Sequence, residues 1–163
     1  MPAPRPPRTE PGVGKPRKEP TATQRALGLL VRREHSRPEL ARKLRARGVP
    51  ADEARDAVAR MTQAGWQDDA RFACSLARSR VAGGYGPLRI RMELESHGLD
   101  AAAVDAAFQA LSESGDDDWA GRARALVRRR FGGDLDAPPV RRKAQEFLLR
   151  RGFEGDCVRL VIP

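Results

Sequence analysis

This sequence of 163 residues is 33% charged and only 5% aromatic, which excludes a membrane-embedded protein and argues against a sheet-rich core. Its abundant Ala, Leu and Arg favour helices instead. No stretch approaches the roughly 18 apolar residues of a membrane-spanning helix, and the N-terminus lacks the apolar segment of a secretory signal. We therefore expect an all-α, cytoplasmic protein.

The net charge of +9 indicates a class of partner. A basic surface attracts nucleic acids and acidic protein surfaces. The same excess of arginine is equally consistent with a solvated surface that has no dedicated partner.

Residues 1–21 form a proline-rich segment of their own. They hold seven of the 13 prolines, together with five basic and two acidic residues, a net charge of +3. This composition predicts an extended, disordered, basic arm that cannot pack. It serves either as a solubilising leader or as a contact for phosphates.

From Thr23 onward, apolar residues recur at helical spacing. A first helix is expected to end near His35. A second begins at the capping-box pattern Ser36-Arg37-Pro38-Glu39 and ends at Gly48. In a capping box the serine oxygen accepts a hydrogen bond from a backbone N–H of the first turn, and the glutamate side chain accepts one from the serine backbone N–H. A third helix is expected over residues 51–64.

The same order of three helices recurs twice more along the chain. Each second helix closes on a glycine that follows a leucine at a fixed distance; these pairs are Leu44 and Gly48, Leu94 and Gly98, and Leu148 and Gly152. We therefore expect three tandem three-helix repeats over residues 22–65, 66–114 and 115–163, the last with a short final helix. Stacked repeats of this kind form an elongated, curved array.

The stretch Gly65-Trp66-Gln67-Asp68-Asp69-Ala70-Arg71-Phe72-Ala73 is the seam between the first two repeats. Gly65 is placed to close a helix in the left-handed conformation, and Trp66 is expected to pack back on that turn. The two aspartates supply the capping carboxylate and the negative first turn of the next helix.

No catalytic or metal-binding pattern is apparent. The loop Gly83-Gly84-Tyr85-Gly86-Pro87 has neither the strand before it nor the Lys-Ser/Thr after it that a phosphate loop requires, so it is interpreted as a helix connection. Cys74 and Cys157 are expected as buried free thiols, and His35 and His97 lie near predicted helix C-termini. The sequence predicts no enzyme, no cofactor and no metal site, and it places every aromatic residue except the loop tyrosine in the core.

The arginine clusters are the strongest functional candidates. If one face of the array collects them, that face complements a phosphate backbone or an acidic partner and binds in a salt-dependent way. The alternative is that they cover solvated helix faces. The candidate binding residues are Arg78, Arg89, Arg91, Arg128, Arg129, Arg130, Arg141, Arg142 and Lys143.

The three repeats and the seam together resemble the RecX family of bacterial recombination regulators. The similarity runs from about Thr23 to Ile162; the seam, Arg78 and the glycine-ended second helices carry it, and the proline-rich arm lies outside it. The resemblance implies a non-enzymatic protein that binds the RecA recombinase filament on single-stranded DNA. It implies restraint of filament growth, ATP hydrolysis and strand exchange, with effects on recombination, DNA repair and the SOS response. It transfers no catalytic residue and leaves open whether DNA is contacted directly.

Two other functions stay open. Charge alone favours a general basic DNA-binding helical module, for which residues 37–47 are the only segment suited to act as a recognition helix. A structural scaffold with neither activity is the third alternative. Stacked repeats with a polar exterior favour a monomer.

Overall fold

The computed structural model describes residues 19–132 and 135–163, so nearly all of the predicted N-terminal arm lies outside the described residues. Within those ranges the protein has nine helices and no strand, which confirms the all-α prediction. The helices are α1 (Ala22–Leu30), α2 (Arg37–Arg45), α3 (Ala51–Gln63), α4 (Asp69–Ala82), α5 (Pro87–Ser96), α6 (Ala101–Glu113), α7 (Trp119–Phe131), α8 (Pro138–Arg150) and α9 (Gly155–Val161).

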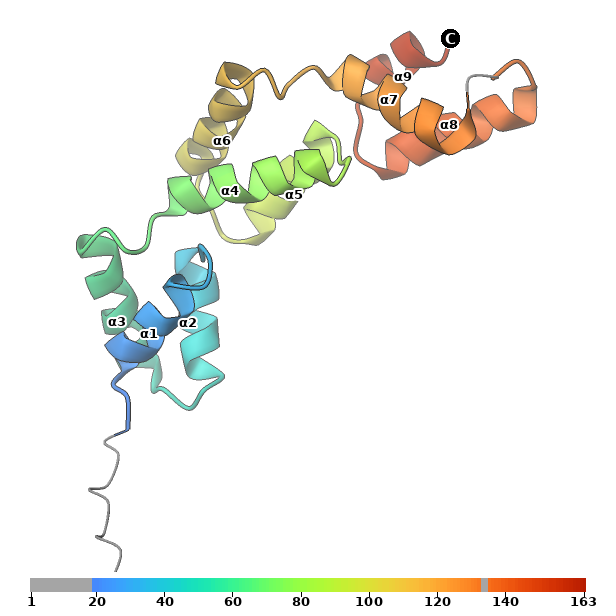
Figure 1. The fold of residues 1–163 in the computed structure, drawn as a ribbon. Helices are drawn as coiled ribbons and strands as arrows, with labels where there is room; N and C mark the ends of the chain where they lie inside the picture. The colour runs from blue at the N-terminus through green and yellow to red at the C-terminus, as the bar shows by residue number, and fades with distance from the viewer. Residues whose placement is uncertain (1–18, 133–134) are drawn as a thin grey trace, which may run out of the picture.

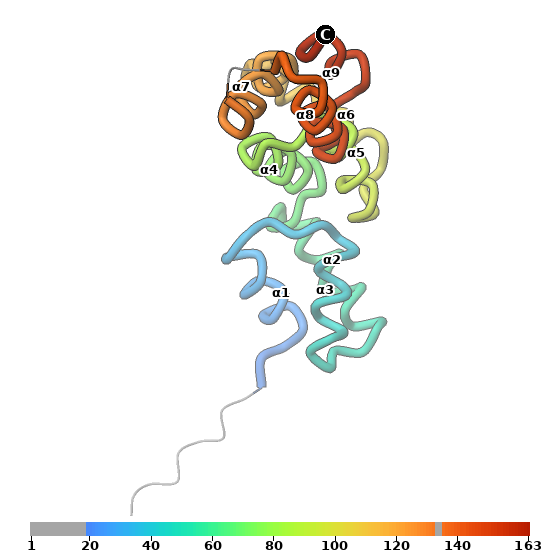
Figure 2. The backbone as a smooth tube through the Cα atoms, turned by 90° about the vertical axis from the view of Figure 1, so that its right-hand side faces the viewer, coloured from blue at the N-terminus to red at the C-terminus, as the bar shows by residue number. Residues whose placement is uncertain are grey.

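The helices form three consecutive groups with the same internal packing. In each group the first helix packs against the third, and the second contacts both. Each group has its own apolar core, built around Leu40 and Leu44, then Ile90 and Leu94, then Leu148. The groups follow one another in an elongated, bent array (Figure 1). Turned by 90°, α1–α3 stand at one end and α4–α9 gather at the other (Figure 2).

Most helix starts are fixed by the capping residues that the sequence indicates. The carboxylate of Asp68 accepts from the backbone N–H of Arg71 at 2.9 Å, and the hydroxyl of Ser36 accepts from that of Glu39 at 3.3 Å. The capping box at Ser36 is nevertheless incomplete, because the Glu39 carboxylate points to Arg33 and His35 instead. The first helix also ends earlier than predicted, at Leu30.

The seam has the backbone that its sequence predicts, but its tryptophan is not in the core. Gly65 has a φ of 75°, the left-handed conformation that closes α3. Trp66 donates its backbone N–H to Met61 O at 2.9 Å, while its side chain is 52% exposed. The core prediction for Trp66 was therefore wrong, because the backbone closes the turn without the ring. Phe72, at 4% exposed, is a core residue as predicted.

The two cysteines also differ from the prediction. Cys74 and Cys157 are free thiols, but both are only partly buried. They lie at the edges of the second and third cores, where the packing leaves part of each side chain uncovered.

The second helices of consecutive repeats meet end to end. The hydroxyl of Ser36, at the start of α2, donates to the carbonyl of His97 at the end of α5, at 3.1 Å. The backbone N–H of Gly86, at the start of α5, donates to the carbonyl of Arg151 at the end of α8, at 2.8 Å. Leu88 adds a second bond of this kind, to Gly152 O at 3.0 Å. We call these two contacts the first and second joints.

The end of α2 and the start of α8 have no neighbouring repeat to join, and their backbone groups differ from those at the two joints. At the end of α2, the carbonyl of Arg47 accepts from the Arg25 guanidinium of α1 at 3.0 Å. At the start of α8, Pro138 and Pro139 occupy the first two helical positions. Proline has no backbone N–H, so the donor that Leu88 provides at the second position of α5 is missing from the second position of α8.

Candidate binding surface

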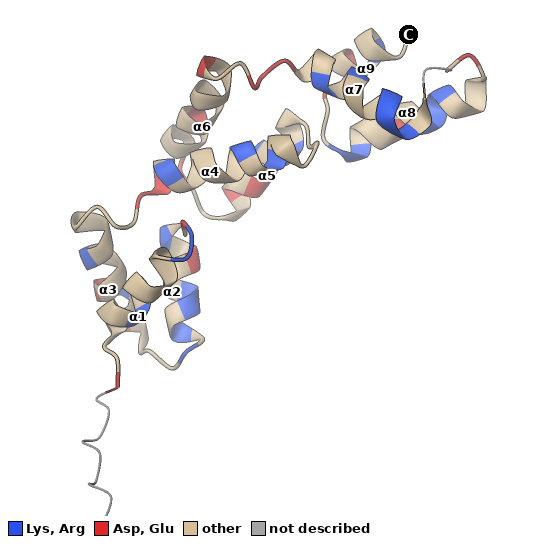
Figure 3. Cartoon of the chain, viewed as in Figure 1, with Lys and Arg blue, Asp and Glu red and all other residues tan. Residues whose placement is uncertain are grey.

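All nine candidate residues lie in the second and third repeats. Arg78 is on α4, Arg89 and Arg91 are on α5, and the remaining six are on α7 and α8. All are exposed except Arg141, which is half-buried. Figure 3 shows basic residues along α4, α5, α7 and α8 as well as on α1–α3, and acidic residues both in the links between repeats and on several helices. The candidate residues thus lie on helix surfaces, and their role in binding stays a prediction.

Three of the nine have partners within the chain. The Arg91 guanidinium lies 4.6 Å from the centre of the Phe108 ring, with Asp105 at 3.8 Å. Arg141 Nε donates to the carbonyl of Leu135 at 3.3 Å. Arg130 lies 5.5 Å above the Phe147 ring. These contacts hold the guanidinium groups in fixed places without neutralising Arg130 or Arg141.

The other six make no ion pair or hydrogen bond through their side chains to the described residues. They are Arg78, Arg89, Arg128, Arg129, Arg142 and Lys143. An exposed cation without an internal partner keeps its full attraction for a phosphate or an external carboxylate. These residues are consequently the ones most available for binding.

The structure adds a residue that the candidate set omitted. Arg151 lies 5.2 Å from the ring of Phe147 on α8 and 5.0 Å from the ring of Tyr85 in the preceding repeat. It also donates to the carbonyl of Gly83 at 2.8 Å. Phe147 therefore contacts two guanidinium groups, those of Arg130 and Arg151, at the second joint. Phe147 and Arg151 are four residues apart at the end of α8, but no local pattern links them to Arg130 or Tyr85, which come from other segments.

A buried polar cluster lies at the first joint. His35 is 2% and Glu39 6% exposed. His35 Nδ1 is 3.1 Å from the Glu39 carboxylate, without the alignment of a hydrogen bond, and Arg33 reaches the same carboxylate from the other side at 2.5 Å. The prediction that His35 interacts with the end of a helix was wrong, because α1 has already ended and the ring turns inward.

This cluster shifts the pKa of both titratable groups. Burial lowers the pKa of His35 below its ordinary value, and the neighbouring carboxylate only partly offsets that effect. Burial alone raises the pKa of Glu39, but the hydrogen bonds from Arg33 and the proximity of His35 outweigh it, so this pKa is also lowered. The joint therefore favours a neutral imidazole beside an ionised carboxylate.

Two polar residues of the seam, Gln67 and Asp69, complete the first joint. Gln67, only 1% exposed, donates its amide N–H to His35 O at 3.2 Å and to the Asp69 carboxylate at 2.8 Å. Asp69 in turn accepts from both the backbone N–H and Nε of Arg37 at 2.9 Å. Residues of the seam thus bind the two repeats together as well as capping helices.

No group of three His, Cys, Asp or Glu residues in the described ranges is placed to hold a metal ion. Among the same residues, no helix has the length and apolar character needed to cross a membrane.

The fold and surface define a tandem three-helix repeat protein with unpaired basic side chains on its second and third repeats. Three family models match in succession: the RecX first three-helix domain over residues 22–61, the second over 68–107 and the third over 116–162. The chain belongs to the RecX family.

Curated relatives agree with these domain matches. The chain is 56% identical to "Regulatory protein RecX" of Xanthomonas axonopodis pv. citri (strain 306) over 151 residues, covering 91% of this chain and 90% of that protein. It is 57% identical to "Regulatory protein RecX" of Stenotrophomonas maltophilia (strain K279a) over 144 residues, covering 87% and 85%. The crystal structure of RecX from Lactobacillus salivarius superposes with a TM-score of 0.69 at 23% identity, over 86% of this chain and 92% of that one.

Proposed function

We propose that this chain is a non-enzymatic, monomeric, cytoplasmic regulator of the RecA recombinase. It binds the RecA filament on single-stranded DNA and inhibits filament growth, ATP hydrolysis and strand exchange, and so modulates recombination, DNA repair and the SOS response. The observation that carries the proposal is the uninterrupted succession of three RecX domains, which the chain shares with regulatory proteins along most of their length.

The geometry supports a partner that is itself elongated. Each repeat has a separate core, and the joints link the repeats through directional hydrogen bonds, so successive repeats present their surfaces in a fixed order. The unpaired cations extend from α4 to α8. Such an array contacts several neighbouring subunits or phosphates at once, and its affinity falls with added salt.

The direct test is ATP hydrolysis by RecA on single-stranded DNA while this protein is added, with salt and total DNA held fixed. Inhibition at a small fraction of the RecA concentration supports control of the filament, because covering the DNA competitively requires nearly stoichiometric protein. Inhibition only near saturation of the DNA, or no inhibition, contradicts the proposal.

A general basic DNA-binding helical module is the alternative, and the six unpaired cations are the observation that favours it. This alternative predicts equal binding to naked DNA and to RecA-coated DNA. Tight binding to the filament together with weak binding to naked DNA favours the regulator.

A further inference from the structure

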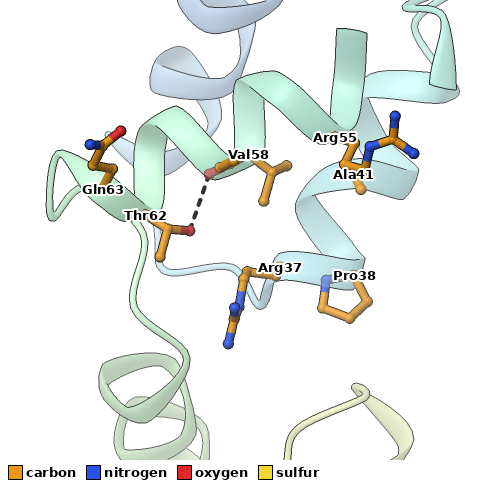
Figure 4. Close-up of a pocket in the computed structure, with 8 residues that line it drawn as sticks. Arg37, Pro38, Ala41, Arg55, Val58, Thr62 and Gln63 are labelled. Carbon is orange, nitrogen blue, oxygen red and sulfur yellow. Dashed lines mark hydrogen bonds between the residues drawn. The ribbon is translucent and has the colours of Figure 1, made fainter. Parts of the chain in front are cut away.

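The first repeat contains an open groove between α2 and α3. Its volume is about 560 Å³, and its floor is formed by Pro38, Ala41, Val58 and Ala59. Arg37 and Arg55 carry guanidinium groups at its edge (Figure 4). Arg37 is bound to Asp69 through Nε, and Arg55 has no ion pair with the described residues. The groove is thus largely apolar inside, with Thr62 and Gln63 also in its lining, and its rim carries one ion-paired guanidinium, that of Arg37, and one guanidinium without an ion pair to the described residues, that of Arg55.

The corresponding space in the second repeat is filled by the chain itself. Ala41, Arg55 and Val58 have as their equivalents Arg91, Asp105 and Phe108. The Arg91 guanidinium covers the Phe108 ring at 4.6 Å and is 3.8 Å from Asp105.

The third repeat also fills this position from within. Gln145 stands at the place of Ala41 and donates to Ile162 O at 3.2 Å. Of the three repeats, only the first has a small residue at this position of its second helix.

The comparison with the second repeat shows which groups are missing from the groove of the first. The second repeat places a large side chain over its third helix and pairs it with a carboxylate. The first repeat has an alanine where that side chain begins and an arginine where the carboxylate stands. An occupant from outside therefore has to bring a large apolar group for the floor and negative charge for the rim.

We infer that the groove between α2 and α3 binds an acidic segment of RecA that inserts one large apolar side chain between the two helices. This assignment rests on the proposed function, and it places a protein contact in the first repeat, away from the unpaired cations of the second and third.

Two other occupants fit the groove less well. The N-terminal arm of the same chain, residues 1–21, has a net charge of +3, which Arg55 at the rim disfavours. Single-stranded DNA binds on aromatic rings, and the lining of this groove has none.

The test variant closes the groove by copying the second repeat. Ala41→Arg with Arg55→Asp recreates the Arg91 and Asp105 pair at equivalent positions. Ala41 is half-buried and Arg55 exposed, so the change leaves the core intact. The matched control, Ala102→Arg with Arg60→Asp, makes the same two exchanges at exposed positions outside the groove. Helical content by circular dichroism checks that both variants are folded.

Affinity is measured by anisotropy of the fluorescently labelled full chain on RecA filaments assembled with a slowly hydrolysed ATP analogue, and on the same DNA without RecA. We expect the groove variant to bind filaments about tenfold more weakly, the control to bind as the wild type does, and binding to naked DNA to be unchanged. Equal filament binding by the groove variant overturns the groove assignment and leaves the proposed function standing. Failure of the wild type to bind filaments overturns both.

Two further outcomes identify a different occupant. An equal loss of naked DNA binding by the groove variant means that the groove holds nucleic acid. A wild type that dimerises in sedimentation, together with a groove variant that does not, means that it holds a second copy of this chain. Either result refutes the assignment to RecA.

Discussion

Ser36 and His97 lie 61 residues apart in the chain, yet the hydroxyl of the first donates to the carbonyl of the second at 3.1 Å. Gly86 and Arg151 make the equivalent contact one repeat later, through a backbone N–H at 2.8 Å. One mode of contact, the start of a second helix on the end of the next, therefore links all three repeats. Gly98 and Gly152, which end α5 and α8, therefore lie against the start of the preceding second helix, whereas Gly48 at the end of α2 has no such neighbour.

Alanine at the glycines after α2 and α8 should destabilise the protein unequally. Both Gly48 and Gly152 have positive φ, of 81° and 83°. A Cβ at Gly152 would lie 2.4 Å from the Cβ of Arg89 across the second joint, whereas a Cβ at Gly48 would meet nothing within 4 Å. We expect Gly48→Ala to cost about 1 kcal/mol from backbone strain and Gly152→Ala about 2 kcal/mol or more. Urea unfolding followed by circular dichroism measures both, and equal losses would contradict the joint.

The two large aromatic residues of the seam should differ sharply when truncated. Phe72→Ala removes a ring that is 4% exposed and should cost about 3–5 kcal/mol. Trp66→Ala removes a ring that is 52% exposed and should cost about 1 kcal/mol or less. The midpoint of urea denaturation is the measurement. A larger loss for Trp66 would mean that its ring is buried in solution.

Neutralising Arg128, Arg129 and Arg130 to glutamine should weaken binding to RecA filaments and to DNA without unfolding the chain, because all three are exposed. On single-stranded DNA, the slope of log affinity against log salt should flatten by about 0.7 for each phosphate that the variant no longer neutralises. The matched control is the same triple exchange at Arg42, Arg45 and Arg47.

These two triple variants also separate the functional alternatives. If residues 37–47 form a recognition helix, the variant at Arg42, Arg45 and Arg47 should lose more DNA affinity than the variant at Arg128, Arg129 and Arg130. An unchanged salt dependence in the variant at Arg128, Arg129 and Arg130 would exclude these three arginines from the binding surface.

Acidification should loosen the first joint. The pKa of His35 is lowered in the folded state, so the unfolded chain takes up a proton first as the pH falls through the ordinary value of 6.5, and stability is lost. The lowered pKa of Glu39 acts in the same direction at lower pH, below its ordinary 4.5. Urea midpoints measured from about pH 7.5 to about pH 5.5 should decline. His35→Gln should flatten that decline. If the urea midpoint of the variant falls with pH as steeply as that of the wild type, protonation of His35 does not cause the loss of stability.

The helices and their order could be predicted because their signals are local. Leu44, Leu94 and Leu148 each lie in the apolar stripe of a second helix, and a glycine with positive φ follows each of them at the same place. The exposure of Arg128 to Arg130 could be predicted similarly, because charged side chains are seldom buried unpaired and the apolar face of this helix is occupied by Ala123, Leu126 and Val127.

The joints could not be predicted, since their partners are distant in the sequence. Gln67 resembles any solvated polar residue in a turn until His35 and Asp69 are brought to its amide. The large apolar side chain of Trp66 resembles that of a core residue, and the sequence does not show that it points towards solvent. The contact of Arg151 with Tyr85 likewise depends on the packing of two repeats.

The mode of contact that joins the repeats is altered at both ends of the array. The carbonyl of Arg47, at the end of α2, is already occupied by Arg25. The opposite end starts with Pro138 and Pro139, which have no N–H to donate. At one end the acceptor is therefore already engaged, and at the other the start of α8 keeps the N–H of Ala137 but lacks the second donor that Leu88 supplies to the second joint. The two ends of the array are thus chemically unlike each other and unlike the joints between its repeats.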